Sequence, residues 1–242
     1  MSDTETRVTA PEDPRDALGT VLVTGGASGL GRAIADAIDK AGGTPVVFDI
    51  AEPGGNVEWE RVDLADARAA EAAVARVVDR HGGLDAVVTA AGVDACGDLA
   101  DVPAGDWERV IAVNLIGTAA IVRAALPTLV RRRGRVVTVA STLGLRALPA
   151  ATAYSASKFG VVGFTRALAA EMAGRVGVTL LLPGGMRTAF FDDRPEQFKP
   201  AADQQLNRPE DVAEAVLFAL RQPAGCEVRE LLIAPSTEPS WP

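Results

Sequence analysis

The sequence predicts a single α/β domain with a doubly wound parallel sheet of about seven strands and helices on both faces. Short runs rich in Val, Ile and Leu alternate along the chain with longer segments whose apolar residues recur at helical spacing. Strands that are apolar on both faces are typical of parallel sheets covered by helices. The length of 242 residues suits one such domain, and no linker or internal repeat divides it.

The first half of the chain supplies four predicted strands. Residues 1–17 mix charges and prolines without periodicity, so we expect a mobile tail before a domain spanning 18–242. Two predicted helices place their Ile, Val and Ala residues on one face each. Strands are predicted at 20–24, 45–50, 57–62 and 84–90, and helices at 30–41 and 67–80.

The second half continues the alternation. Pro209 suits the first turn of a last helix because its ring fixes φ and it has no N–H. Residues 188–207 form the longest irregular segment, and such segments are often lids over binding sites. Helices are predicted at 106–132, 152–173 and 209–221, and strands at 134–140, 176–182 and 228–234.

Composition excludes several function classes. The net charge of −8 disfavours binding to nucleic acid or to anionic lipid, and Arg131 to Arg133 fits the solvated end of a helix. No apolar stretch approaches the ~18 residues of a membrane span, and the N-terminus lacks the order of a signal peptide. We therefore expect a cytoplasmic protein without a membrane or nucleic-acid partner.

Metal and thiol chemistry are also not predicted. Cys96 and Cys226 cannot form a disulfide framework, and His81 is the only histidine. No residues have metal-ligand spacing, so the sequence predicts no metal site and no Ser-His-Asp catalysis.

A glycine-rich segment, Thr24 to Gly31, lies between the first strand and the first helix. There, backbone N–H groups and the helix dipole can hold a pyrophosphate, although glycines in this pattern also form simple tight turns. Asp49 ends the next strand, where a carboxylate can accept a hydrogen bond from the ribose 2′-OH of NAD and repel the 2′-phosphate of NADP. Neither Ser28 nor Ile50 supplies a cation, so NAD is predicted over NADP.

Asp63 follows the third strand and has two interpretations. Its carboxylate can receive the adenine amino group, or it can cap the next helix, as Asp66 also can. Both remain open from sequence.

Tyr154, the only tyrosine, precedes Lys158 by four residues on a predicted helix. This spacing places both on one helix face. A lysine ammonium there would lower the phenol pKa and make Tyr154 a general acid or base near neutral pH. The alternative is an accidental pair, which is improbable because the chain has only three lysines.

These residues resemble the compact, single-domain branch of the short-chain dehydrogenase/reductase family, from about residue 20 to 234. Its T-G-x-x-x-G-x-G motif matches Thr24 to Gly31, its Y-x-x-x-K matches Tyr154 to Lys158, and P-G-x-x-x-T matches Pro183 to Thr188. The positions of its catalytic serine and asparagine hold Ser141 and Asn114. The family's N-N-A-G appears as Thr89 to Gly92, T-A-A-G, which affects local stability more than chemistry.

The resemblance implies a Rossmann-type fold and a catalytic tetrad. Ser141 would hold the substrate oxygen, Tyr154 would exchange a proton with it, Lys158 would bind the nicotinamide ribose and tune Tyr154, and Asn114 would support a relay water. The expected cofactor contacts are Gly25, Ser28, Gly29, Leu30, Gly31, Asp49, Ile50, Asp63, Leu64, Ala90, Ala91, Gly92, Tyr154, Lys158, Pro183, Gly184, Met186 and Thr188. The expected substrate contacts are Ser141, Leu143, Tyr154, Gly185, Phe190 and Phe191, with Leu145, Met186 and Phe198 as further candidate walls.

The predicted function is an NAD(H)-dependent interconversion of a secondary alcohol and a ketone. The alternatives are a 3-oxoacyl-carrier-protein reductase using NADPH and, from another class, a non-catalytic nucleotide-binding sensor. The lid phenylalanines suggest an apolar or ring-containing substrate, but such residues also pack lids down.

Two helices, 106–132 and 152–173, carry more apolar residues than one core-facing stripe needs, so we expect a homotetramer or homodimer. The alternative is burial within the monomer. The apolar residues in question are Ile111, Leu115, Ile121, Val122 and Leu126 on one helix, and Val161, Val162, Phe164, Leu168 and Met172 on the other.

Overall fold

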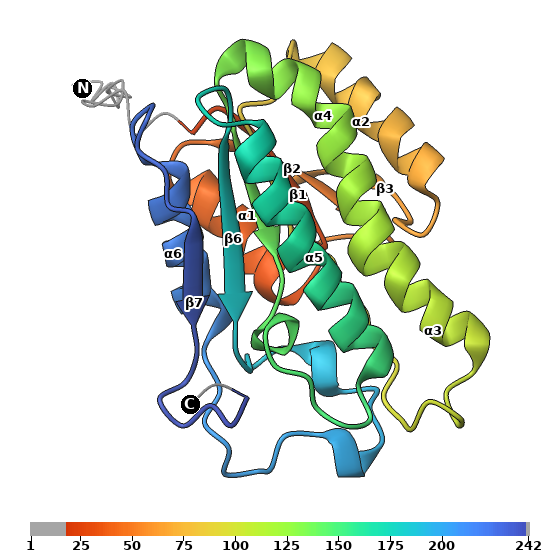
Figure 1. The fold of residues 1–242 in the computed structure, drawn as a ribbon. Coiled ribbons are helices and arrows are strands. Elements are labelled where there is room, and N and C mark those ends of the chain that lie inside the picture. The colour runs from red at the N-terminus through yellow and green to blue at the C-terminus, as the bar shows by residue number, and fades with distance from the viewer. Residues whose placement is uncertain (1–17, 241–242) are drawn as a thin grey trace, which may run out of the picture.

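A single parallel sheet organises the computed structural model, which describes residues 18–240 (Figure 1). Its seven strands run in the order β3-β2-β1-β4-β5-β6-β7, which confirms the predicted fold class. The predicted tail, residues 1–17, lies outside the described residues. The strands are β1 (Thr20–Thr24), β2 (Thr44–Asp49), β3 (Glu58–Arg61), β4 (Ala86–Thr89), β5 (Arg135–Val139), β6 (Gly177–Pro183) and β7 (Glu230–Ile233).

Helices cover both faces of this sheet. On one face α1 and α6 pack against each other, and α2, α4 and α5 cover the opposite face. Successive residues of a strand point to opposite faces, so Leu22 joins the core beneath α2 and α4 while Val21 and Val23 join the core beneath α1 and α6. The helices are α1 (Gly29–Lys40), α2 (Ala67–His81), α3 (Ala104–Ile111), α4 (Thr118–Arg132), α5 (Thr152–Glu171) and α6 (Pro209–Leu220).

The strand order reverses between β1 and β4, and such a switch point opens a crevice at the carboxyl ends of the strands. Thr24 and Thr89 are register partners there, and both side chains are buried. The Thr24 hydroxyl accepts a hydrogen bond from Ala91 N at 3.1 Å. Among residues 18–240, none forms a hydrogen bond with the Thr89 hydroxyl. Thr24 therefore links the two central strands. Thr89, the residue that departs from the family motif, places a buried hydroxyl there that no described residue bonds.

The predicted helix 106–132 differs from the structure. It begins earlier, at Ala104, and a π-helical segment at Ala112–Gly117 separates α3 from α4. Asn114 lies on this segment. Its Oδ1 accepts a hydrogen bond from Val93 N, and its Nδ2 donates one to Val93 O. At Gly117 a Cβ atom would lie 2.7 Å from both Leu64 Cβ and Leu64 O, so the turn packs closely against the loop after β3. Such π-turns are frequent at functional sites.

The continuous helical stretch Ala104–Arg132 is also long and apolar enough to cross a membrane, contrary to the expectation from sequence. Half of its most apolar window is buried inside the fold, mainly against α2 and the sheet. It packs as a core helix.

The prediction that helices 106–132 and 152–173 expose surplus apolar residues is partly wrong. Five of the ten residues, Ile121, Val122, Val161, Val162 and Leu168, are buried within this chain. Leu115, Leu126, Phe164 and Met172 are partly buried and pack against the same cores. The exposed apolar side chains nearby are instead Ile116 and Phe159, which are 50% and 45% exposed.

Candidate active site

A cavity of about 560 Å³ lies at the carboxyl ends of the strands. It extends from Asp49 and Asp63 at one end to Tyr154 and Lys158 at the other. All eighteen expected cofactor contacts line it, as do the six expected substrate contacts. Leu145 does not: it packs into the core beneath α5.

The glycine-rich turn leaves room for a phosphate. At Gly31 a Cβ atom would lie 2.1 Å from Gly25 O, and Gly25 itself has a φ of +72°, so neither position accepts a side chain without strain. Ser28 is the N-cap residue of α1 but makes no side-chain capping bond. The first amides of α1 therefore remain free of a side-chain cap, and they suit the pyrophosphate of a dinucleotide.

Asp49 lies beside this turn. Its carboxylate accepts hydrogen bonds from Ala27 N at 2.9 Å and Ala51 N at 3.0 Å, so it braces the glycine-rich loop while lining the cavity. Ile50, next to it, is 50% exposed.

Asp63 does not cap α2, because the capping bonds come from Asp66, which accepts from Arg68 N and Ala69 N. The Asp63 carboxylate instead accepts from Ala65 N and pairs with both Nη atoms of Arg109. Of the two sequence interpretations, the helix cap belongs to Asp66, and Asp63 is a cavity wall.

Tyr154 and Lys158 share one face of α5, as their spacing predicts. The Lys158 ammonium lies 5.5 Å from the phenol ring centroid and donates to Val139 O at 3.0 Å. Burial lowers the Lys158 pKa to about 8. The expectation of a lowered phenol pKa is wrong for this structure: burial and the Asp94 carboxylate raise the pKa of Tyr154 to about 12, against smaller opposing effects of Ser141 and Arg194. Tyr154 is thus a neutral phenol, a proton donor.

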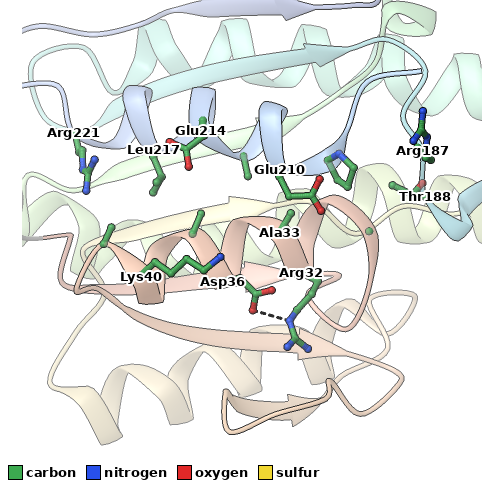
Figure 2. A pocket seen from close by; sticks show the side chains of 15 residues that line it. Arg32, Ala33, Asp36, Lys40, Arg187, Thr188, Glu210, Glu214, Leu217 and Arg221 are labelled. Atoms are coloured by element: carbon green, nitrogen blue, oxygen red, sulfur yellow. Dashed lines mark hydrogen bonds and ion pairs between the residues drawn. The ribbon is translucent and has the colours of Figure 1, made fainter. Parts of the chain in front are cut away.

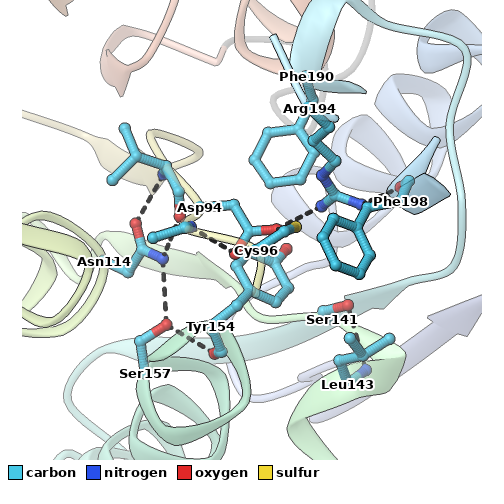
Figure 3. Close-up of polar contacts among 12 residues, drawn as sticks. Asp94, Cys96, Asn114, Ser141, Leu143, Tyr154, Ser157, Phe190, Arg194 and Phe198 are labelled. Atoms are coloured by element: carbon cyan, nitrogen blue, oxygen red, sulfur yellow. Dashed lines mark hydrogen bonds and ion pairs between the residues drawn. The ribbon is translucent and has the colours of Figure 1, made fainter. Parts of the chain in front are cut away.

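Ser141 follows β5 and faces Tyr154 across the cavity (Figure 3). Its Oγ also accepts from Leu143 N at 3.1 Å, which fixes the turn that presents it.

Asn114 is the one predicted catalytic residue that does not line the cavity. Its amide is 1% exposed, and its Nδ2 donates to Val93 O and to Ser157 Oγ. Ser157 Oγ in turn donates to Tyr154 O (Figure 3). The side chain of Asn114 therefore holds the loop after β4 against the helix that carries Tyr154.

Sequence reasoning missed two groups of cavity residues. Arg194 projects from the predicted lid segment and pairs with Asp94. Near the C-terminus, Glu238 accepts from Gly185 N at 2.8 Å, and the buried Ser240 hydroxyl bonds Thr142 Oγ1 at 2.7 Å. None of these residues belongs to a recognisable motif, and their contacts join distant parts of the chain.

A second hollow, of about 600 Å³, lies between α1 and α6 (Figure 2). Its walls carry charges of both signs, including the Arg32–Asp36 ion pair at 2.7 Å. Tyrosine, cysteine, serine and histidine are absent from the described residues that line it. Within residues 18–240, no three His, Cys, Asp or Glu side chains are grouped to hold a metal.

A family-wide sequence profile described as "short chain dehydrogenase" matches residues 19–199. This chain belongs to the short chain dehydrogenase family. It is an NAD(P)-dependent oxidoreductase acting on CH–OH groups.

Other members of this short chain dehydrogenase family resemble the chain over most of its length. The 3-oxoacyl-[acyl-carrier-protein] reductase FabG of Thermotoga maritima is 31% identical over 81% of this chain and 88% of the relative. The D-beta-hydroxybutyrate dehydrogenase of Rhizobium meliloti is 34% identical over 74% and 76%. An alcohol dehydrogenase from Thermococcus sibiricus, solved with 5-hydroxy-NADP, superposes with a TM-score of 0.79 at 26% identity, covering 88% of this chain and 95% of that one.

Proposed function

We propose that this short chain dehydrogenase interconverts a secondary alcohol and a ketone with NAD(H), using Tyr154 as the general acid and base. The observation that carries the proposal is the convergence of Tyr154, Ser141 and Lys158 at one end of a cavity whose other end holds the glycine-rich turn and Asp49. A bound nicotinamide would supply hydride chemistry at that end.

Each of the three residues has a physical role. Ser141 Oγ can donate to the substrate oxygen, and the neutral phenol of Tyr154 can protonate that oxygen as negative charge develops on it. In the oxidative direction the phenol must first lose its proton. With its pKa at about 12, oxidation is expected to accelerate as pH rises through the neutral and alkaline range. Below its pKa of about 8, Lys158 carries a positive charge that favours the tyrosinate.

The preference for NAD rests on charge at the adenosine end. Asp49 would repel a 2′-phosphate, and Ile50 provides no cation. Arg109 is the cation that lines this end among the described residues, and it is already paired with Asp63.

A 3-oxoacyl-carrier-protein reductase is the second candidate, because a relative with that activity covers 81% of the chain. The two candidates differ in cofactor and in acyl group. An NADPH-dependent enzyme acting on 3-oxoacyl thioesters would support the second, and an NADH-dependent enzyme acting on simple ketones would support the first.

The test is a substrate panel followed by nicotinamide fluorescence with NADH and NADPH in parallel. The panel contains small ketones, ring-containing ketones, 3-oxoacids and 3-oxoacyl thioesters. Turnover of a ketone with NADH at least about tenfold above NADPH in kcat/KM supports the proposal. Turnover confined to thioesters with NADPH would replace it with the second candidate.

We also infer a homo-oligomer. The support is Ile116 on the π-helical segment and Phe159 on α5, two large apolar side chains that are about half exposed. A two-fold interface that pairs the α4 and α5 region with its copy would cover them.

A further inference from the structure

The segment between β6 and α6 folds over the catalytic end of the cavity through two short 3₁₀ turns, Ala189–Phe191 and Glu196–Phe198. Arg194 lies between these turns. Its guanidinium is 5.0 Å from the ring centroid of Phe190 (Figure 3) and 4.6 Å from that of Phe191, so it stacks on both rings. The guanidinium of Arg194 therefore holds the two phenylalanine rings of this segment together.

That cation reaches across the site to the loop that follows β4. Arg194 Nη2 donates to Asp94 Oδ2 at 2.5 Å, and the two side chains are only 19% and 7% exposed. Asp94 also accepts hydrogen bonds from Ala95 N and from Cys96 Sγ, which fix its direction. By contrast, the Arg208–Glu210 pair at the end of the same segment is 64% and 59% exposed.

A buried ion pair gives little net stability, because removing both charges from water costs about as much as their attraction returns. A pair in this position is better explained by the geometry it fixes. Phe190, stacked beneath Arg194, lies with its ring centroid 5.6 Å from that of Tyr154. The ion pair thus fixes the segment whose ring covers the phenol.

We propose that Arg194 and Asp94 form a latch that holds residues 188–207 closed over the substrate compartment and positions Phe190 against Tyr154. Both are positioning residues, and the inference rests on the proposed role of Tyr154 as acid and base. When the latch is closed, the segment shields the phenol from water. When it opens, substrate can enter and product can leave.

The latch also places two opposite charges, the Asp94 carboxylate and the Arg194 guanidinium, near the phenol of Tyr154. Asp94 raises the phenol pKa and Arg194 lowers it. The other titratable groups facing the phenol are Lys158 on α5 and Cys96 on the loop after β4, whose own pKa is raised to about 12 by burial and by Asp94. The two halves of the latch should therefore shift the pH profile in opposite directions, which a purely structural role would not do.

The experiment compares Asp94→Asn and Arg194→Met with the matched control variants Glu210→Gln and Arg208→Met. Hydrogen exchange of the amides of residues 189–198 is measured in the full chain with NAD⁺ present, and thermal unfolding confirms that each variant folds. We expect exchange at these amides to accelerate about tenfold or more in both latch variants and to stay unchanged in both controls. Equal exchange in the latch and control variants would overturn the latch.

Kinetics of alcohol oxidation with the best substrate of the panel supply the second readout. We expect KM to rise about tenfold in each latch variant, and kcat to fall by a smaller factor. The alkaline rise of kcat/KM should move to lower pH in Asp94→Asn and to higher pH in Arg194→Met. Shifts in the same direction, or none, would contradict the positioning of Tyr154 by this pair. If the wild-type chain turns over no member of the panel, the proposed function fails, while hydrogen exchange still decides the latch.

Discussion

The buried hydroxyl of Thr89, at the centre of the sheet, leads to a quantitative prediction about the free energy of unfolding. Thr89 is 1% exposed, and Thr89→Val replaces its hydroxyl, which has no partner among the described residues, with a methyl group of nearly the same shape. A buried polar group without a hydrogen bond costs ~1–3 kcal/mol, so the variant should gain ~1–2 kcal/mol in its free energy of unfolding. For a chain of this size that is a rise in Tm of about 2–4 °C per kcal/mol.

Thr24→Val is the matched control, because Thr24 is the register partner of Thr89 on β1 and is equally buried. Its hydroxyl accepts from Ala91 N, so the same chemical change leaves that amide unpaired and should lower stability by ~1–3 kcal/mol. Both are measured by urea and thermal unfolding at one protein concentration, since assembly would shift the apparent stability. A Thr89→Val variant that loses as much stability as Thr24→Val would refute the reasoning.

Three further predictions concern the cofactor, the buried lysine and assembly. Asp49→Asn should lower the preference for NAD⁺ over NADP⁺ by roughly tenfold to a hundredfold in titration calorimetry, and adding Ile50→Arg should lower it further; an unchanged ratio would contradict the charge argument. The pKa of Lys158 falls from its ordinary 10.5 to about 8 on folding, so at this group the unfolded chain binds more protons and the free energy of unfolding should rise with pH. The rise should be clearest between pH 8 and 9, because above pH 9 the raised pKa values of Cys96 and Tyr154 act in the opposite direction. Lys158→Met should abolish that rise, and a variant whose stability still rises as steeply would place the titration elsewhere. Light scattering should give a mass of two or four chains, reduced by Phe159→Glu, whereas a mass of one chain would refute assembly.

The features that could be predicted are those that depend on a few neighbouring residues in the sequence. Apolar runs such as Val21 to Val23, bounded by Gly25 and Gly26, predict the strands and the nucleotide-binding turn because period and turn chemistry act over a few residues. The spacing of Tyr154 and Lys158 likewise places both on one helix face. Ser141 could be located only through the family resemblance.

What the sequence could not predict depends on contacts between distant residues. The π-helical segment accompanies the bond of Asn114 to Val93, and the Asp94–Arg194 pair joins positions 100 residues apart. The phenol pKa was predicted in the wrong direction because the charge of Lys158 was visible in the sequence, whereas burial and the approach of Asp94 were not. Desolvation of a side chain depends on tertiary packing, and the pattern of neighbouring residues in the sequence does not show that packing.

Tyr154→Phe tests the central claim most directly, because it deletes only the atom assigned to proton transfer. Steady-state turnover of the best substrate and calorimetric binding of NAD⁺ are measured on the same preparation. We expect kcat to fall by about a thousandfold, within the range of lost acid–base catalysis, while the Kd for NAD⁺ changes by less than about twofold. A variant that keeps a tenth of the wild-type rate with unchanged NAD⁺ binding would show that Tyr154 is not the general acid and base.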